Sequence, residues 1–242
     1  DTLSYVRLFC GDQHGGGAQT SIITFNKETK GFVYKPVNLS IIQFFHDLIE
    51  YTKSNFGFTF KKIPAIIEKK SIGAVDYGYI NYIPYSGNVK NATEAEDVYA
   101  NFGQVLAFAR FFKVSDGHSD NIVINSPDVF WIDLENTFHT VASDFVGVAD
   151  FHPLEVTGLI VNAKPETTVF GIVTGIQGGK MQRLNLTQPV AYNDGTDAMY
   201  IRYFTLTDVS VQDKKNRIYI DNVMCMPEDY ISSIKNGYDK AI

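Results

Sequence analysis

The 242-residue sequence predicts an α+β fold, and three features support this prediction. Short apolar segments separated by turn residues predict β-hairpins, and apolar residues recur at helical spacing in two longer stretches. With 45% hydrophobic and 14% aromatic residues, the chain can also bury a substantial core.

The first elements predict a hairpin that carries a lysine. Residues 5–9 are apolar and strand-like, and they lead into a glycine-rich loop at 11–17 whose glycines can adopt positive φ. A second strand is expected at 20–25, and turn residues separate it from a third strand at 32–35. Lys35 therefore lies at the end of the return strand.

An amphipathic helix and a pair of strands are expected next. Apolar residues between 39 and 55 recur at helical spacing, so we expect this helix to pack on the hairpin. The segment 63–83 is extended in character and predicts two strands, followed by a loop at 84–88. The apolar positions of the helix are Ile41, Ile42, Phe45, Leu48 and Ile49.

A long helix and a second hairpin follow. Residues 94–112 carry one apolar stripe, which indicates a central helix half buried in a core. A polar loop at 116–121 comes directly after it. Apolar strands at 122–124 and 129–134 are separated by a turn at 125–128, so they predict a hairpin that ends in acidic residues.

The remainder of the chain has a looser pattern. Short strands are expected at 159–161, 169–173 and 218–220, with a turn at 177–179. The stretch 228–242 predicts a helix that is still running where the sequence stops. Because the chain also begins without methionine, we expect it to be an excerpt of a longer protein.

The composition argues against several classes of protein. A net charge of -6 and a pI near 5.3 provide no basic surface for a nucleic acid or an anionic membrane. No apolar run approaches the length of a membrane span, and the N-terminus lacks the pattern of a signal peptide, so we expect a cytoplasmic protein. Cys10 and Cys225 belong to no C-x-x-C pair, which favours buried free thiols over zinc ligands or a disulfide.

Four polar side chains, taken in order, fit phosphoryl transfer from ATP. This chemistry needs a lysine to hold phosphates, oxygen ligands for Mg²⁺, and a carboxylate near the attacking hydroxyl. Lys35 follows the glycine-bearing hairpin, and Asp133 ends the later one. Asp116 stands five residues before Asn121, which is the spacing of kinase catalytic loops. We therefore predict an ATP and Mg²⁺ site formed by these four residues.

Each of these residues also has an ordinary structural explanation. Lys35 can keep its ammonium in water, and Gly15–Gly17 can be only a flexible turn. Asp116 and Asn121 can stand at a helix end and in a turn, and Asp133 can be an ordinary polar residue of a loop. The dense polar run between apolar elements, and the very apolar strand before the last acid, favour the functional interpretation.

Two histidines are candidates for the same site. His14 and His118 lie in the glycine-rich and polar loops, whereas the chain's other histidines show no ligand spacing that would indicate zinc. Asp47 or Glu50 can pair with Lys35, as a helix acid does in protein kinases, but a solvated helix face explains them better.

Taken together, five motifs resemble the dehydratase domain of class II lanthipeptide synthetases. Their order and spacing agree with those of that domain across roughly the first 140 residues. Weaker similarities follow at 194–199 and 234–238. The motifs are Gly11-Asp12-Gln13-His14, Tyr34-Lys35-Pro36, Tyr77-Gly78-Tyr79, Asp116-Gly117-His118-Ser119-Asp120-Asn121 and Asp133-Leu134-Glu135.

The resemblance implies a core similar to that of lipid kinases. It also implies an enzyme that uses ATP and Mg²⁺ to phosphorylate serine and threonine in a precursor peptide, and then eliminates phosphate to leave dehydroamino acids. From their positions in the motifs, Asp12, His14, Asp116 and His118 are expected to have catalytic roles. Asp116 is then the residue that orients or deprotonates the substrate hydroxyl.

Binding roles follow from the same comparison of motifs. We expect Lys35, Gly15 and Gly16 to bind the nucleotide. The metal ligands are expected to be Asn121, Asp133 and Glu135. The expected partners are the precursor peptide and a cyclase domain in the same full-length chain.

The sequence also departs from the family's pattern. The family usually has Tyr-Gly-Trp with an acid two residues later, where this chain has Tyr77-Gly78-Tyr79-Ile80-Asn81, and Gly-Thr where this chain has Val114-Ser115. Neither change removes an expected ligand. The arginine and threonine that the family uses for elimination are expected beyond Ile242, so the residues present support phosphorylation more directly than elimination.

The sequence as a whole predicts a two-lobed, kinase-like α+β fold. Residues 1–90 are expected to form an N-terminal lobe of sheet and one helix, and residues 91–242 a lobe of helices and the catalytic hairpin, with ATP between them. Two alternatives stay open: a kinase-fold phosphotransferase acting on a small molecule or lipid, and a non-catalytic kinase-like binding module.

Overall fold

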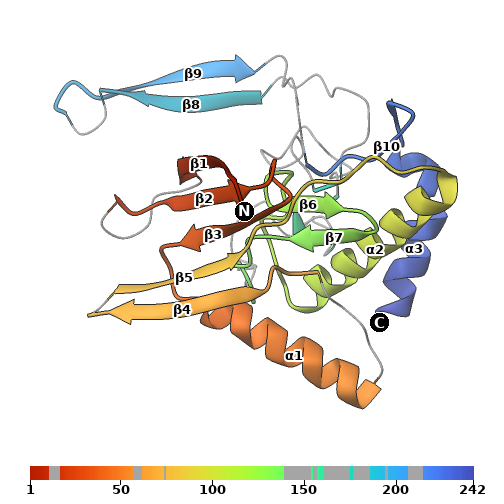
Figure 1. The fold of residues 1–242 in the computed structure, drawn as a ribbon. Coiled ribbons are helices and arrows are strands. Elements are labelled where there is room, and N and C mark those ends of the chain that lie inside the picture. The colour runs from red at the N-terminus through yellow and green to blue at the C-terminus, as the bar shows by residue number, and fades with distance from the viewer. Residues whose placement is uncertain are drawn as a thin grey trace.

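The structure is a computed structural model that describes residues 1–10, 17–56, 62–73, 75–138, 154, 157–160, 175–176, 186–193, 196–206 and 215–242. It is a mixed α+β fold with an antiparallel sheet, as the sequence predicts (Figure 1). The elements in order are β1 (Leu3–Cys10), β2 (Thr20–Phe25), β3 (Lys30–Lys35), α1 (Ser40–Phe56), β4 (Ile66–Ile72), β5 (Val75–Asn81), α2 (Ala92–Phe111), β6 (Ile122–Asn125), β7 (Asp128–Trp131), β8 (Leu186–Tyr192), β9 (Tyr200–Leu206), β10 (Tyr219–Ile220), β11 (Val223–Met224), the 3₁₀ turn η5 (Pro227–Tyr230) and α3 (Ile231–Lys240).

The first five strands form one antiparallel sheet in the order β1-β2-β3-β5-β4. The hairpin predicted to carry Lys35 is confirmed as β2 and β3, which pair from Ser21 opposite Tyr34 to Phe25 opposite Lys30. On its other side β3 pairs with β5, so Lys35 faces Gly78 across the ladder. Lys35 therefore stands on the central strand of the sheet.

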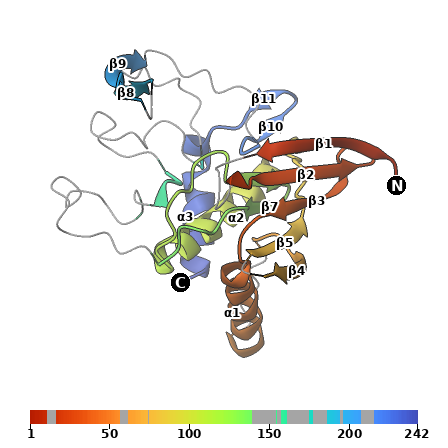
Figure 2. The same cartoon turned by 90° about the vertical axis from the view of Figure 1, so that its left-hand side faces the viewer.

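Helix α1 lies against this sheet (Figure 2). Leu39 and Ile42, at the start of the helix, pack with Ile80 of β5 in a small apolar cluster. A side chain at Gly78 would collide with Leu39 and with the backbone carbonyl of Glu68. Glycine at this position therefore allows the helix to approach the strand beside Lys35.

The main apolar core lies around α2, next to the sheet. Its largest fully buried side chains include Trp131, Phe45 and Ile122, so α1, the β6–β7 hairpin and α2 share one core. Asn91 caps α2 by accepting a hydrogen bond from the backbone N–H of Glu94 at 2.9 Å, which is a common way to begin a helix.

Helix α3 packs along α2 through two glycines. A Cβ atom at Gly103 would collide with the Ile234 carbonyl, and one at Gly237 would collide with the Ala100 carbonyl. The two backbones can approach this closely only because neither glycine has a side chain. In the described part of the chain no helix is both long and apolar enough to cross a membrane.

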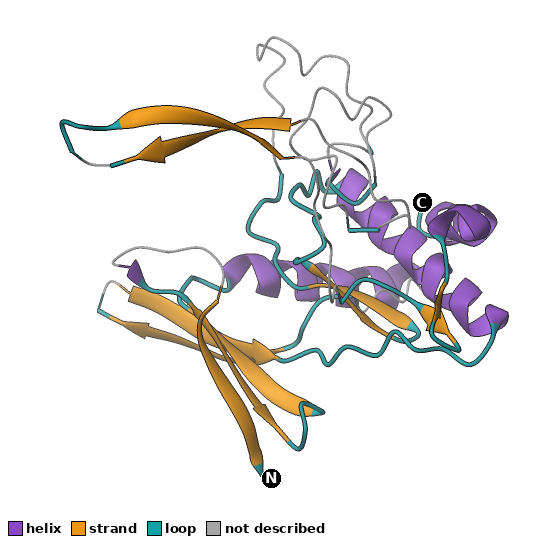
Figure 3. Cartoon of the chain, turned by 90° about the horizontal axis from the view of Figure 1, so that it is seen from above, coloured by secondary structure: helices purple, strands orange, loops and turns teal. Residues whose placement is uncertain are grey.

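The β8–β9 hairpin was not predicted from the sequence. It extends away from the five-stranded sheet when the chain is viewed from above (Figure 3). Tyr192 and Tyr200 stack across it with ring centroids 5.3 Å apart, and the guanidinium of Arg202 lies 5.7 and 5.5 Å from the two rings.

Several other predicted elements need correction. The strand expected at 129–134 ends at Trp131, and Leu159–Ile160 form a bend rather than a strand. The helix expected at 228–242 is divided into η5 and α3, and α3 ends at Lys240. The strand at 169–173 and the turn at 177–179 lie outside the described residues.

Candidate functional site

A pocket of about 670 Å³ lies where the five-stranded sheet meets the polar loop 116–121 and the β6–β7 hairpin. Its walls come from β1, β2 and β3, from residues 80–83, from the polar loop, and from the segment after β7. The structure brings six of the predicted site residues to this pocket: Lys35, Asp116, His118, Asn121, Asp133 and Glu135. Asp12, His14, Gly15 and Gly16 lie outside the described residues.

Lys35 makes the central ion pair of the pocket. Its side chain is largely buried, and its Nζ lies 2.9 Å from Asp133 Oδ2 and 3.9 Å from Glu135 Oε1. The helix acids do not take part, because Glu50 pairs with Lys53 and Asp47 accepts a hydrogen bond from Gln43. The prediction of a solvated helix face for these two acids is therefore confirmed.

The β6–β7 hairpin brings Asp133 next to Asn121. The two strands pair from Ile122 opposite Trp131, so the residues that flank the hairpin are neighbours in space. The ladder continues one step further, since the Ile132 N–H donates to the Asn121 carbonyl at 2.9 Å. The predicted proximity of an amide and a carboxylate follows from this pairing.

Asp116 is held by amide donors from both sides. Asn121 Nδ2 donates to the Asp116 backbone carbonyl at 2.9 Å and approaches Oδ2 at 3.5 Å, and Asn136 Nδ2 donates to Oδ2 at 3.2 Å. Asp116 has φ of 71°, in the left-handed region that aspartate and asparagine tolerate better than most residues. The loop therefore fixes both the backbone and the carboxylate of Asp116.

His118 completes this group. The backbone N–H of Asp120 donates to His118 Nδ1 at 3.2 Å, and the second ring nitrogen is Nε2. That nitrogen lies 3.6 Å from Asp116 Oδ1 and 3.3 Å from Asn121 Nδ2. His118 and Asn121 therefore both lie beside the Asp116 carboxylate, and Asn121 donates to it.

The oxygen atoms of the pocket suit a hard cation. Because Asn121 uses its amide nitrogen on Asp116, its carbonyl oxygen Oδ1 is the atom that can bind a metal beside the Asp133 carboxylate. Among the described residues no three His, Cys, Asp or Glu side chains form a metal-binding group by themselves. A cation here would therefore share its coordination with a ligand, as Mg²⁺ commonly does with phosphates.

The sequence matches, over residues 1–242, the family described as Domain of unknown function (DUF4135). The chain belongs to the DUF4135 family. Since the match covers the whole chain, every element described above lies inside the DUF4135 domain.

The DUF4135 chain is also similar to a curated protein of Lactococcus lactis subsp. lactis, the lacticin 481/lactococcin biosynthesis protein LcnDR2. The two are 24% identical over 255 residues, which covers 99% of this chain and 26% of that protein. The DUF4135 chain thus spans about a quarter of the length of this relative.

Some residues in or beside the pocket were not identified from the sequence of the DUF4135 chain. Arg7 and Lys215 line the pocket, Asn136 holds Asp116, and Ser119 lies beside the other loop residues. Ser119 is 1% exposed, and its hydroxyl has no hydrogen-bond partner among the described residues. Ser119 stands within a motif but was assigned no role, Asn136 directly follows the motif that ends at Glu135, and Arg7 and Lys215 stand in segments without any motif.

Proposed function

We propose that this chain is the kinase-like portion of a lanthipeptide dehydratase. In this proposal it transfers phosphate from ATP to serine or threonine of a ribosomal precursor peptide, as the first step of dehydration. The observation that carries the proposal is that Lys35, Asp133, Asn121 and Asp116 line one pocket. The printed name of the Lactococcus relative, a lacticin 481/lactococcin biosynthesis protein, supports the class of substrate.

The proposed fold is two-lobed and similar to that of lipid kinases. The sheet and α1 would make the N-terminal lobe, to about residue 90, and α2, α3 and the β6–β7 hairpin would belong to the C-terminal lobe, residues 91–242. The position of the pocket supports this division, because its walls come from the sheet on one side and from residues 116–135 on the other. Ligand sites commonly occur at such junctions.

The proposed nucleotide site has an apolar part and a charged part. Ile22 and Val33 from the sheet and Val123 and Ile132 from the opposite wall are suited to a flat, apolar ring such as adenine. Lys35 would bind the phosphates, since a lysine ammonium is a compact charge of the kind that holds nucleotide phosphates. Ser119 also belongs to the wall of this pocket, and its buried hydroxyl has no hydrogen-bond partner among the described residues.

Asn121, Asp133 and Glu135 are the proposed Mg²⁺ ligands. Two of them pair with Lys35 in this structure, so lysine and carboxylates are already adjacent where phosphates and cation would meet. Bound Mg²⁺ would neutralise the charge of the phosphates. The carboxylates keep Lys35 oriented toward this point.

Asp116 is the residue proposed to bind the hydroxyl of the substrate peptide. Its carboxylate accepts hydrogen bonds from Asn136 and Asn121, and His118 Nε2 lies 3.6 Å from it. It would accept a hydrogen bond from the serine or threonine O–H and take its proton as the oxygen attacks phosphorus. His118 and Asn121 would stabilise the oriented carboxylate.

Further steps belong to the proposal for the longer protein. Because the chain spans 26% of the relative, phosphate elimination and a cyclase domain are proposed for a longer chain that contains this portion. The order of reactions would then be phosphorylation here, followed by elimination and ring formation.

The test is a phosphorylation assay on the full-length protein. A precursor peptide is incubated with ATP and Mg²⁺, and mass spectrometry follows both the gain of phosphate and the loss of water at serine or threonine, since the longer protein would also eliminate phosphate. Phosphorylated or dehydrated peptide should form with the natural chain and not with Asp133→Asn, while Asp97→Asn on the exposed face of α2 serves as control. Tight ATP binding with no phosphate on any peptide, together with labelling of a lipid or small molecule, would contradict the proposal.

A further inference from the structure

The pocket contains a second cationic group besides Lys35. Arg7 of β1 and Lys215 both line it, and in the described residues neither forms an ion pair with a carboxylate. Lys35, by contrast, lies between Asp133 and Glu135. Lys35 therefore has two carboxylate partners, whereas Glu28, the acid that acts on Lys215, forms no ion pair with it in the described part of the chain.

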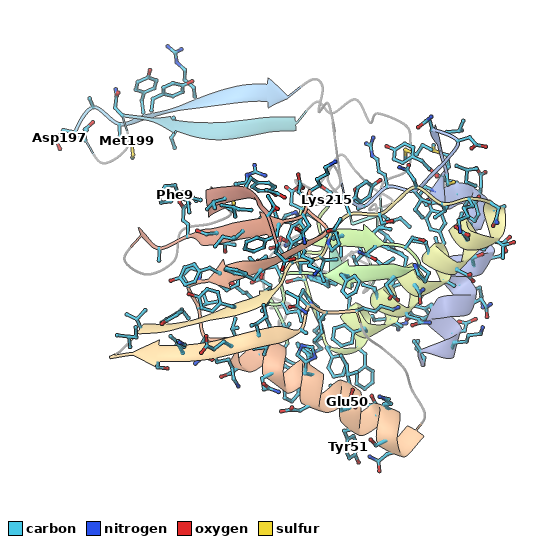
Figure 4. The ribbon with its side chains drawn as sticks, in the orientation of Figure 1. Phe9, Glu50, Tyr51, Asp197, Met199 and Lys215 are labelled. Atoms are coloured by element: carbon cyan, nitrogen blue, oxygen red, sulfur yellow. The ribbon has the colours of Figure 1, made fainter. Side chains whose placement is uncertain are left out.

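Lys215 is held in place from two directions. Its backbone carbonyl accepts the Ile124 N–H at 2.8 Å, which fixes it beside β6. Its Nζ donates to Tyr82 Oη at 3.4 Å and lies 5.3 Å from the centre of the same ring, and the Tyr82 side chain is buried. Figure 4 shows Lys215 at the junction between the sheet and β6. The ammonium is thus positioned by a buried ring rather than by a carboxylate.

Arg7 reaches the pocket because of its pairing in the sheet. It lies opposite Ile22 in the β1–β2 ladder, and cross-strand partners share a face of a sheet. Ile22 also lines the pocket. An irregularity in the pairing follows between Arg7 and Cys10, where Phe9 has φ of 58°. Such bulges re-aim neighbouring side chains and often occur beside binding sites.

The two cations are close enough to affect each other. Burial lowers the pKa of Lys215, the negative charge of Glu28 opposes this shift, and the positive charge of Arg7 makes a smaller contribution that lowers the pKa. Two positive groups that face one pocket without a bound anion repel each other. An anion with two charges would relieve this repulsion.

We propose that Arg7 and Lys215 form a phosphate-binding subsite at this end of the pocket, separate from the centre around Lys35. A guanidinium binds phosphate oxygens through two parallel N–H bonds, and an ammonium adds a compact charge. The subsite goes beyond the proposed phosphoryl transfer, because binding a phosphate group here requires no transfer. The phosphate can belong to a nucleotide or to a phosphorylated peptide.

The test measures the binding of inorganic phosphate to the full chain by calorimetry. Arg7→Gln and Lys215→Gln should each lower the affinity about tenfold or more, as expected for a lost charge-assisted hydrogen bond. Lys53→Gln, an exposed lysine on α1, should leave the affinity unchanged. Arg7 is exposed, so its variant should fold normally, and thermal unfolding of each variant checks this.

Two further arms identify the source of the phosphate and separate this inference from the proposed function. If a nucleotide supplies the phosphate, Arg7→Gln and Lys215→Gln should also weaken the binding of ATP in the presence of Mg²⁺. If a peptide supplies it, a phosphoserine peptide should compete with inorganic phosphate for the subsite, and the two substitutions should leave ATP binding unchanged. Lys35→Met should abolish phosphoryl transfer and retain phosphate binding. The subsite is excluded if the natural chain binds no phosphate, or if binding survives in both Arg7→Gln and Lys215→Gln.

Discussion

Lys35 Nζ contacts Asp133 Oδ2 at 2.9 Å, although the two residues are 98 positions apart in the sequence. The contact joins the central strand of the sheet to the end of the β6–β7 hairpin. Lys35, for which an ammonium in water was the alternative interpretation, is therefore a largely buried partner of Asp133 and Glu135.

Lys35→Met should separate the catalytic from the structural role of this contact. Methionine fills a similar volume but cannot hold phosphates, so we expect phosphorylation of the peptide to fall by about 10²-fold or more. The free energy of unfolding should change by only about 1 kcal/mol, because the Asp133 and Glu135 side chains are 31% and 39% exposed and water can hydrate them.

The measurements are an initial-rate assay and a urea titration. Lys53→Met, which removes an exposed ion pair with Glu50, is the matched control and should keep full activity. An active Lys35→Met variant would show that the lysine has no part in phosphate binding.

Asp116→Asn tests the carboxylate without disturbing the backbone. Asparagine tolerates the φ of 71° found here, so the free energy of unfolding should stay within about 0.5 kcal/mol of the natural chain. The rate of phosphorylation should fall by about 10²- to 10⁴-fold, because the amide cannot accept the hydroxyl proton.

Rates and thermal unfolding of Asp116→Asn are compared with those of Asp97→Asn on α2. Equal activity of the two variants would remove Asp116 from the mechanism and favour a non-catalytic binding module. A large loss of stability in Asp116→Asn alone would instead mean that the carboxylate holds the loop together.

Tyr85 should make the fold sensitive to alkaline pH. Burial raises the pKa of Tyr85 from 10.0 to about 12, with a further contribution from Tyr219 that Arg217 partly opposes. A pKa raised by folding stabilises the protein below the unfolded value and loses this effect as the pH rises through the folded value. The free energy of unfolding should therefore decline between about pH 10 and pH 12.

Tyr85→Phe should reduce this decline and also cost stability at neutral pH, since the Tyr85 hydroxyl donates to the Arg217 carbonyl at 2.9 Å. Urea titrations at a series of pH values give both quantities. Part of the decline should persist, because burial also raises the pKa of Tyr82 and of Tyr99. Tyr51→Phe on the exposed side of α1 is the control, and an unchanged slope in Tyr85→Phe would refute the assignment.

Gly103→Ala should destabilise the protein even though alanine is the better helix former. The added Cβ collides with the backbone of α3 at Ile234, so we expect a loss of about 1–3 kcal/mol in the free energy of unfolding. Glu96→Ala, at an exposed position of the same helix, should be neutral or slightly stabilising. A Gly103→Ala variant more stable than the natural chain would show that α3 is not packed this closely.

Local patterns predicted most of the first half of the fold. β2 was predicted with its observed bounds, and α1 and α2 were placed within about two residues, because helical spacing and turn residues are properties of short segments. The β8–β9 hairpin was missed partly because Pro189 argues against a strand. In a sheet of only two strands, a proline can turn its missing N–H away from the ladder.

The candidate site was predicted where its residues stand in motifs. Asp116, His118 and Asn121 lie in one loop, so the sequence already places them together. Arg7 and Lys215 meet through the fold alone, and in the sequence each resembles an ordinary surface cation. The direct ion pair between Lys35 and Asp133 was not predicted, since the sequence indicates only that both residues belong to one site.

The central place of β3 determines how firmly the lysine is aimed. Slippage of this strand by one residue would turn Lys35 to the opposite face of the sheet, and it would have to break the ladders with β2 and β5 at the same time. An edge strand such as β1 is restrained by one neighbour only. Two ladders of backbone hydrogen bonds therefore fix the direction of the Lys35 ammonium group. A shift in register of an edge strand would leave that direction unchanged.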